Sequence, residues 1–263
     1  AINMRTLVSA QSALRMKMFF YGICPRISAG RNTCGRGAFF NISVPEEDPG
    51  IKHDSAYNRD LAMALGIRDY QGTFFLPSDR DASEKVAALL RQASGSLVGA
   101  HPGGAPSRRW PADNFIRSLN LIHEREPVTV VLTGSSDERS LLSSIARSIK
   151  APVINCAGEL SIGELIALIQ RCAVYISNDT SVMHIAAVAG VPQIALMGPG
   201  DLTRFDPRVL SRHAFVFYTK AACAPCNKVI CRDLRCLRSI LPEDVARQAC
   251  ILLGEKKEQL NSI

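Results

Sequence analysis

Residues 176–199 read Ile-Ser-Asn-Asp-Thr-Ser-Val-Met-His-Ile-Ala-Ala-Val-Ala-Gly-Val-Pro-Gln-Ile-Ala-Leu-Met-Gly-Pro, and they decide the fold class. Val174 to Ser177 has the length of a strand, Val182 to Ala189 is a small apolar helix that stops at Gly190, and Val191 to Met197 returns to strand character. A strand, a helix and a strand of these lengths form a crossover between parallel strands. The sequence therefore predicts an open parallel α/β sheet.

Polar residues gather where the first of these strands ends. Asp179 is expected at the carboxyl end of the strand, Thr180 or Ser181 is expected to cap the helix, and His184 falls in its first turn. Parallel sheets bind ligands at this edge, and the N-terminus of a helix suits a phosphate. Ordinary capping chemistry with a histidine in the core explains the same residues, so this segment alone leaves both interpretations open.

The remainder of the second half repeats the alternation of strand and helix. The predicted strands are residues 97–100, 128–133 and 153–156, and the predicted helices are residues 112–125, 137–149 and 162–172. This spacing indicates a doubly wound α/β domain. A natural break at Ser94-Gly95 divides the chain into an incomplete first domain, residues 1–94, and a Rossmann-like domain, residues 95–263.

Three predicted loops open on the carboxyl edge of that sheet: residues 101–109, 133–137 and 177–181. Gly103 and Gly104 let backbone amides approach an anion, while Arg108 and Arg109 add positive charge suited to phosphate oxygens. Together they favour a diphosphate, although Pro-Gly-Gly alone is a turn and Arg-Arg alone a solvated pair. The loop matches neither G-x-G-x-x-G nor a Walker P-loop, so a dinucleotide oxidoreductase or an NTPase is not supported.

Composition places the chain among folded globular proteins, with 263 residues, 47% of them hydrophobic and 21% charged. No apolar run approaches the roughly 18 to 20 residues that span a bilayer, and no signal peptide is evident. Nine cysteines, an odd number, are unlike a secreted disulfide framework. We therefore expect a soluble, cytoplasmic protein.

The net charge of +7 is concentrated near the N-terminus, where residues 1–44 contain no acidic side chain. The cations there are Arg5, Arg15, Lys17, Arg26, Arg31 and Arg36. Such a segment prefers anionic neighbours, either a phosphorylated substrate or the headgroups of a membrane surface, or it is simply a solvated basic surface. Nucleic acid is not expected as a partner, because no recognised nucleic-acid-binding motif is present.

Four motifs of the second half occur together in one known family. They are His101–Pro111 with Phe115, Val130–Gly134, Gly158–Leu165, and Asn178–His184 followed by Gly198-Pro199. In this combination the chain resembles the ADP-heptose:lipopolysaccharide heptosyltransferases, glycosyltransferase family 9. Weaker similarity reaches back through His53–Gly66 and Ser9–Leu14.

The resemblance implies the GT-B fold of two Rossmann-like domains and assigns roles to eight residues. The donor diphosphate would be held by Gly103, Gly104 and Arg108. The sugar-phosphate portion would be bound by Asp179, Thr180, Ser181 and His184, and the nucleobase pocket would be lined by Leu160. The implied reaction is an inverting transfer of heptose or a similar sugar to a lipopolysaccharide core or other glycan, and it is expected at the cytoplasmic face of the membrane. No cofactor or metal is expected, because preorganised amides and a guanidinium can stabilise the departing diphosphate.

The chain departs from the family pattern in ways that leave alternatives open. Family members commonly have glycine at Ser181 and threonine at Gly200, so contacts to the donor sugar are expected to differ. The family's acidic catalytic base is expected before Ala1, and Glu46, Glu47 and Asp48 read as a solvated run. A noncatalytic nucleotide-sugar-binding remnant or partner subunit therefore competes with the transferase, as does a GT-B-like sugar-nucleotide epimerase.

Three features of the C-terminal part are more ambiguous. The closely spaced cysteines Cys223, Cys226, Cys231 and Cys236 fit structural zinc, a disulfide pair or buried thiols, and we expect no metal. Arg204-Phe205-Asp206-Pro207 resembles a loop beside the donor pocket in a variant of the family, or is a plain surface turn. Residues 242–253 form an amphipathic helix of the kind that crosses back between the domains of GT-B proteins.

Overall fold

The structure is a computed structural model that describes residues 1–263 except 48–49, 69–75, 78, 227 and 262–263, and omits the side chains of residues 256–261. It contains two compact units. The smaller unit comprises residues 1–73 with 201–206, and the larger comprises residues 74–200 with 207–263. Asp48, one of the acidic residues predicted as solvated, lies outside the described residues.

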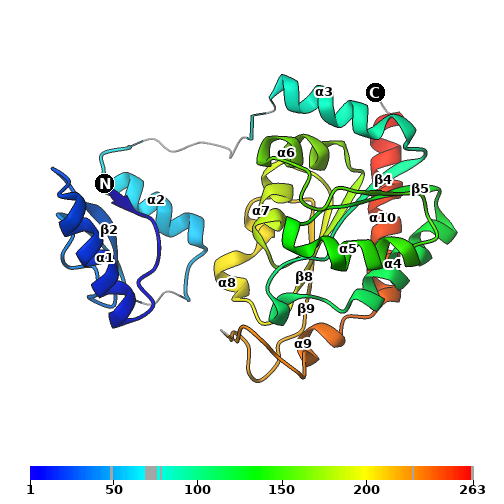
Figure 1. Cartoon of the computed structure of the whole chain (residues 1–263). Helices are drawn as coiled ribbons and strands as arrows, with labels where there is room; N and C mark the ends of the chain where they lie inside the picture. The colour runs from blue at the N-terminus through cyan, green and yellow to red at the C-terminus, as the bar shows by residue number, and fades with distance from the viewer. Residues whose placement is uncertain (48–49, 69–75, 78, 227, 262–263) are drawn as a thin grey trace. The chain divides into compact units, whose positions relative to one another are not determined.

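The larger unit is built on one parallel six-stranded sheet (Figure 1). Its strands are β4 (Ser96–His101), β5 (Val128–Leu132), β6 (Val153–Asn155), β7 (Val174–Asn178), β8 (Gln193–Met197) and β9 (Ala214–Tyr218). Their order in the sheet is β6-β5-β4-β7-β8-β9. The chain reverses its direction of progress between β4 and β7, which creates a topological switch point. The predicted open parallel sheet is confirmed.

Helices cover both faces of this sheet. They are α3 (Arg80–Leu89), α4 (Ala112–Arg125), α5 (Arg139–Ser148), α6 (Ile162–Arg171), α7 (Ser181–Val188), α9 (Arg235–Arg238) and α10 (Pro242–Asn261). One hydrophobic cluster joins α4, α5 and α10 to one face of the sheet, and two others join α3, α6 and α7 to the opposite face. In α4 the residues Phe115, Leu119 and Ile122 recur at helical spacing and are fully buried.

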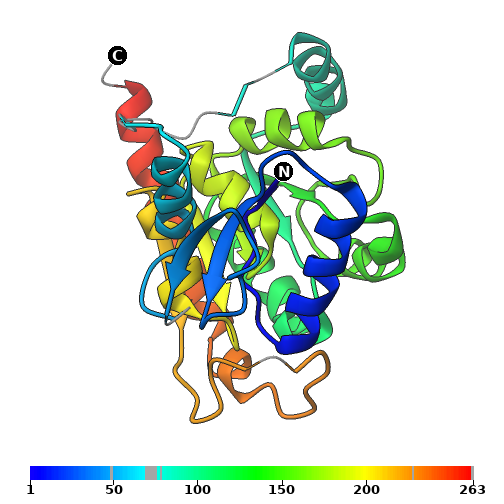
Figure 2. The same ribbon diagram turned by 90° about the vertical axis from the view of Figure 1, so that its left-hand side faces the viewer.

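Helix α3 belongs to the larger unit, whereas the sequence suggested a domain boundary after it, near Ser94. Figures 1 and 2 show α3 beside α6, and the side chains of Ala82 and Val86 pack with Leu168 of α6 in one cluster. Lys85 Nζ also lies 3.0 Å from Glu164 Oε1. Burying the apolar face of α3 against α6 stabilises its position in the larger unit. The turn at Ser94-Gly95, which suggested the later boundary, therefore lies within that unit.

The smaller unit has a three-stranded parallel sheet of β1 (Ile2–Asn3), β2 (Ala29–Thr33) and β3 (Ile42–Glu46). Its helices are α1 (Ala10–Ile23), α2 (Asp54–Ala64) and the short α8 (Leu202–Phe205). Leu7, Phe20 and Phe40 form its buried apolar cluster.

Two charged residues of the smaller unit are buried, which corrects the sequence interpretation. Glu46 was expected in a solvated run, yet it is 1% exposed and its carboxylate lies 3.4 Å from Arg31 Nη1, which also contacts Asp54 at 2.9 Å. Glu46 Oε1 also accepts a hydrogen bond from Thr6 Oγ1 at 2.9 Å. Arg31, counted among the basic surface residues, therefore meets its anionic neighbours inside the protein, because a buried charge needs a partner.

No helix among the described residues has the length and apolar character needed to cross a bilayer.

Candidate functional site

A pocket opens at the carboxyl edge of the large sheet, at the switch point. Its volume is about 350 Å³, within the range of small-molecule sites. Its wall includes Gly104 from the loop after β4, Thr133 from the loop after β5 and Leu160 from the loop after β6. Thr180 from the loop after β7 and Ser181, the first residue of α7, complete this list. The three loops that the sequence predicted to converge therefore do meet in one cavity.

Thr180 contributes a buried polar atom that has no partner among the described residues. Thr180 occupies the N-cap position of α7, as predicted, but its side chain makes no capping hydrogen bond. Its Oγ1 is buried and unpartnered. An N-cap hydroxyl ordinarily accepts a bond from the first turn of its helix. Thr180 itself lines the pocket, and its hydroxyl oxygen is buried beside it.

Asn178 fixes the relative position of two of the loops. Its side chain is fully buried, and its amide Nδ2 donates to the carbonyl oxygens of Pro102 and Gly103, both at 2.9 Å. Its Oδ1 accepts from the backbone N–H of Trp110 at 3.0 Å. The sequence assigned no role to Asn178, although it stands in the motif that carried the family resemblance. Its amide holds the glycine loop against the end of β7.

Glu138 is a pocket residue that sequence reasoning missed. Its carboxylate accepts from the backbone N–H groups of Gly104 at 2.6 Å and Ser135 at 2.9 Å, and lies 3.2 Å from Arg109 Nη2. Burial raises the pKa of Glu138, but the hydrogen bonds from Gly104 and Ser135 and the nearby His101 together lower it, so the pKa lies below its usual value. The spacing Ser135-x-x-Glu138, a capping box, is the sequence signal that could have found it.

The contacts of Glu138 change the expected role of the glycine loop. The N–H of Gly104 donates to a carboxylate within the protein, so it does not point at open solvent in the way the sequence suggested. A side chain at Gly103 would overlap the Glu138 carboxyl group. This close approach, and not contact with an anion, is the reason the structure gives for glycine at position 103.

Arg108 and Asp179, predicted from distant parts of the sequence, form an ion pair with 2.5 Å between Nη1 and Oδ2. The Asp179 side chain is 5% exposed and that of Arg108 is 30% exposed. Burial holds the pKa of Asp179 above its usual value, against the opposing charges of Arg108 and His184. The pair therefore joins a partly exposed arginine to a buried aspartate just before the start of α7.

His101, at the end of β4, is buried and lines the pocket. Its Nδ1 lies 3.1 Å from Thr133 Oγ1, which in turn lies 2.5 Å from the phenolic oxygen of Tyr175. Burial lowers the pKa of His101, and the nearby Glu138 only partly offsets this effect. The chain of hydrogen bonds gives the floor of the pocket a fixed polar lining.

The other predicted residues are distributed as follows. Four of the eight predicted donor-binding residues line the pocket: Gly104, Leu160, Thr180 and Ser181. The described wall of the pocket does not include the other four, Gly103, Arg108, Asp179 and His184. Across the described residues, no group of three or more His, Cys, Asp or Glu side chains is placed to hold a metal ion. Arg204, expected in a loop beside the pocket or a surface turn, belongs to the smaller unit, where its Nη2 lies 2.7 Å from Asp54 Oδ1.

Known proteins resemble this chain in sequence. The family described as Glycosyltransferase family 9 (heptosyltransferase) matches residues 6–236. Lipooligosaccharide heptosyltransferase 2 of Campylobacter jejuni is 27% identical over 172 residues, which cover 63% of this chain and 53% of that protein. The corresponding enzyme of Haemophilus ducreyi is 30% identical over 187 residues, 68% of this chain and 49% of that protein. The chain thus spans about half the length of these relatives.

Solved structures show the same fold. The structure of Escherichia coli ADP-heptose lipopolysaccharide heptosyltransferase II matches with a TM-score of 0.74 and 21% identity, covering 97% of this chain and 76% of that one. A glycosyltransferase family 9 structure from Veillonella parvula matches with a TM-score of 0.77 and 22% identity, covering 92% and 71%. These likenesses confirm the α/β fold of GT-B type. With most of its length matched by the family, this chain belongs to glycosyltransferase family 9, the heptosyltransferases.

Proposed function

We propose that the larger unit binds the nucleoside diphosphate of a nucleotide sugar, and that the chain serves the transfer of heptose or a similar sugar to a lipopolysaccharide core or related glycan. The observation that carries the proposal is the unpartnered Thr180 hydroxyl, buried in a pocket at the start of α7. A buried polar atom without a partner costs free energy, and a polar ligand bound in the pocket that Thr180 lines would supply that partner.

The charges at the site suit a diphosphate leaving group. The first turn of α7 presents backbone amides and the positive end of a helix dipole. Arg108 adds a fixed cation close to that turn through its pair with Asp179. As the bond from the sugar to the diphosphate breaks, negative charge develops on the phosphate, and fixed donors of this kind stabilise it. We therefore propose a transfer with inversion that does not require a metal ion.

Leu160 and Cys156 provide an apolar part of the pocket wall, suited to a nucleobase. The matched Escherichia coli enzyme is named for ADP-heptose, so ADP is the first nucleotide to test. Glu46 does not serve as the base that accepts the acceptor proton in this proposal, because its carboxylate is buried against Arg31. We place the reaction at the cytoplasmic face of a membrane, where a glycolipid acceptor would lie.

The proposal is tested by calorimetric titration of the full chain with ADP in the presence of a chelator. Thr180→Val removes the hydroxyl, and we expect it to weaken ADP binding by about 10-fold to 100-fold, the worth of a hydrogen bond to a charged group. The folded state should lose no stability, because the hydroxyl has no partner to lose among the described residues.

Ser177→Ala is the matched control. Ser177 Oγ is also buried without a partner among the described residues, but Ser177 lies on β7 and does not line the pocket. The control should bind ADP as the natural chain does. Equal affinity of the Thr180→Val variant and the natural chain would refute the site. ADP binding without any sugar transfer from ADP-heptose would instead identify a donor-binding module.

A further inference from the structure

A chain of hydrogen bonds runs from the interior of the large sheet to the wall of the pocket. Tyr175 of β7 is fully buried, its phenolic oxygen lies 2.5 Å from Thr133 Oγ1, and that hydroxyl lies 3.1 Å from Nδ1 of His101. His101 and Thr133 both line the pocket. Neither side chain has a part in the diphosphate site proposed above.

The phenol of Tyr175 has one place for its proton. Among the described residues its only hydrogen-bond partner is Thr133 Oγ1. Burial raises the pKa of this phenol, so it keeps its proton. A buried O–H group without an acceptor costs free energy. Tyr175 therefore donates to Thr133.

Thr133 in turn has its own hydroxyl proton to donate. One acceptor is the carbonyl oxygen of Ala100, which lies 3.5 Å from Oγ1 and already accepts from the backbone N–H of Thr133 at 2.9 Å. The other is Nδ1 of His101, at 3.1 Å. The shorter contact favours Nδ1, which accepts only while it carries no proton. The network thus assigns the proton of a neutral His101 ring to Nε2.

The second ring nitrogen of His101 reaches the pocket. Nε2 makes no hydrogen bond to the described residues, and it is not one of their buried polar atoms without a partner. It therefore borders accessible space. Because His101 is only 8% exposed and lines the pocket, that space is the pocket.

The neighbours of Nε2 favour an anionic ligand oxygen. In the register of the sheet His101 stands opposite Ser177, shortly before Thr180, the N-cap residue of α7. The positive end of α7 attracts an anion to this side of the pocket. An N–H donor at Nε2 suits the same anion.

The surroundings of His101 favour its neutral form. Burial lowers its pKa, and the charge of Arg109 acts in the same direction. Glu138 and the backbone of Thr133 oppose this change. The Cys156 thiol, also in the pocket wall, keeps its proton because burial raises its pKa to about 11. A bound diphosphate would add negative charge beside the ring and raise the pKa of His101.

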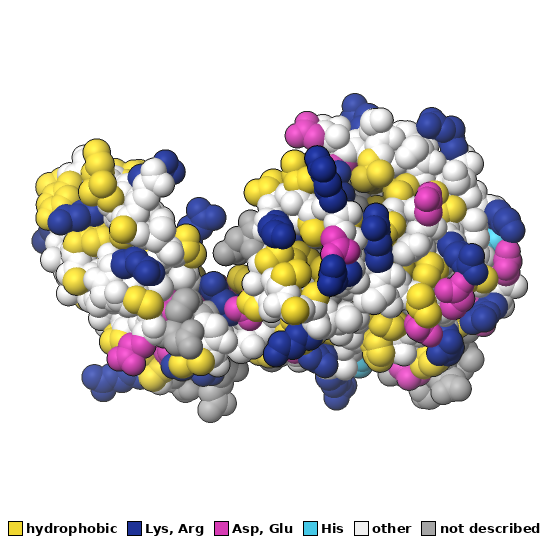
Figure 3. All heavy atoms as spheres, turned by 90° about the horizontal axis from the view of Figure 1, so that it is seen from below, with side chains coloured by type: hydrophobic (Ala, Val, Ile, Leu, Met, Phe, Trp, Pro, Cys, Tyr) yellow, Lys and Arg dark blue, Asp and Glu magenta, His cyan; other side chains and the backbone are white. Residues whose placement is uncertain are grey.

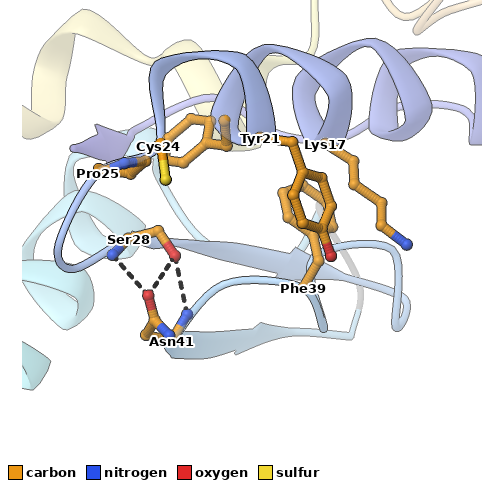
Figure 4. A pocket seen from close by; sticks show the side chains of 8 residues that line it. Lys17, Tyr21, Cys24, Pro25, Ser28, Phe39 and Asn41 are labelled. Atoms are coloured by element: carbon orange, nitrogen blue, oxygen red, sulfur yellow. Dashed lines mark hydrogen bonds between the residues drawn. The ribbon is translucent and has the colours of Figure 1, made fainter.

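Other parts of the molecule offer no equivalent group. A recess of about 260 Å³ in the smaller unit has no histidine in its described wall, and its Asn41 Oδ1 accepts from the backbone N–H of Ser28 at 2.9 Å and from its Oγ at 2.8 Å (Figure 4). Figure 3 shows basic and acidic side chains interspersed on one face of the larger unit, at the right of that view. The charges of that face therefore do not mark a single anion site.

We propose that Tyr175 and Thr133 hold the proton of neutral His101 on Nε2, and that this N–H donates to a diphosphate oxygen of the donor nucleotide. His101 is then a binding residue, and Tyr175 is a positioning residue that acts through Thr133. The inference rests on the proposed function for its ligand. The position of the proton is a property of the ligand-free chain, so it is tested independently of ADP.

The first test is nitrogen NMR of the histidine rings in the full chain without ligand, at about pH 8, above the ordinary histidine pKa. The chain has five histidines, and the signals missing from His101→Gln identify this ring. We expect the proton on Nε2. In Tyr175→Phe the Thr133 hydroxyl can accept from the ring, so part of the proton should move to Nδ1. A proton on Nδ1 in the natural chain, or an unchanged ring in Tyr175→Phe, would overturn the proposal.

Calorimetric titration with ADP tests the contact itself. Glutamine can place an amide N–H near the position of Nε2, whereas asparagine can replace only Nδ1. We expect His101→Asn to bind ADP about 10-fold to 100-fold more weakly, and His101→Gln to retain most of the affinity. Ser118→Ala is the control, because it removes one buried hydrogen bond, to the Phe115 carbonyl at 3.0 Å, outside the pocket. Its ADP affinity should equal that of the natural chain.

The pKa of His101 provides a readout that a purely structural role would not move. It should rise when ADP binds and change little with adenosine, which has no phosphate. No rise with ADP, or equal losses of affinity in His101→Asn and His101→Gln, would refute the contact. Failure of the natural chain to bind ADP would refute the donor site as well, whereas ADP binding that depends on Thr180 but not on His101 would refute this inference alone.

Discussion

Arg108→Ala is expected to destabilise the larger unit in a way that depends on pH. The variant removes the guanidinium that lies 2.5 Å from the Asp179 carboxylate, whose side chain is 5% exposed. Removing one partner of a buried ion pair costs about 3 to 5 kcal/mol. Because the Arg108 side chain is 30% exposed, we expect the lower end of this range, about 3 kcal/mol near neutral pH.

The pH dependence follows from the Asp179 pKa. Burial already raises it, and without Arg108 it should rise further, so the folded variant binds a proton more tightly than the unfolded chain does. The free energy of unfolding of the variant therefore falls as pH rises from about 4, the pKa of an unfolded aspartate, to the folded value. The loss relative to the natural chain should grow by up to about 1.4 kcal/mol for each pH unit between the folded pKa of Asp179 in the natural chain and the higher one in the variant.

Urea unfolding followed by the fluorescence of Trp110 measures this effect. Trp110 is the one tryptophan of the chain, and its backbone N–H is bonded to Asn178, next to Asp179. The difference between variant and natural chain should be smaller at about pH 5 than at about pH 8. Asp179→Asn, which carries no titrating carboxyl, should remove the pH dependence. A loss below about 1 kcal/mol, or one that is equal at both pH values, would refute this account of the pair.

Three further predictions concern other buried contacts. Arg31→Met leaves the Glu46 carboxylate buried without its cation, so hydrogen exchange in residues 1–64 should show a loss of about 3 to 5 kcal/mol. Gly103→Ala should overlap the Glu138 carboxyl and cost about 1 to 3 kcal/mol in thermal unfolding, whereas Gly254→Ala, where nothing would be met, should not show this loss. Burial lowers the pKa of His101, so the neutral side chain contributes stability above about pH 6.5, the pKa of an unfolded histidine, and this contribution is lost as pH falls below that value. In His101→Asn, the free energy of unfolding in urea should therefore decrease less as pH falls. An unchanged pH dependence would contradict this prediction.

Much of the larger unit could be predicted because its elements are encoded locally. The apolar runs around Ile176 and Ile194 have strand length, and Gly190 marks the end of the helix between them. Parallel connectivity then places every loop after a strand at one edge, so the meeting of Gly104 with Thr180 followed from topology.

The partners of charged side chains could not be predicted in the same way. Nothing local distinguishes Glu46 from the acidic residues beside it, and its burial depends on the fold of β2 and β3 around Arg31. The same holds for Glu138, whose carboxylate meets the Gly104 amide across 34 positions of sequence. The place of α3 in the larger unit could not be predicted for a related reason, because it depends on the packing of its apolar face against α6.

The sequence by itself determined the order of strands β4 to β8 and of the helices between them, the sheet edge at which their loops meet, and the family to which the chain belongs. These properties depend on periodicity and on short motifs, which act over one or two turns of chain. Tertiary structure alone decided which of the described hydroxyls are buried without a partner, which carboxylates are buried, and which face of α1 stays exposed. Such outcomes depend on the three-dimensional surroundings of each polar or apolar group, because burial and pairing are properties of contacts between distant segments.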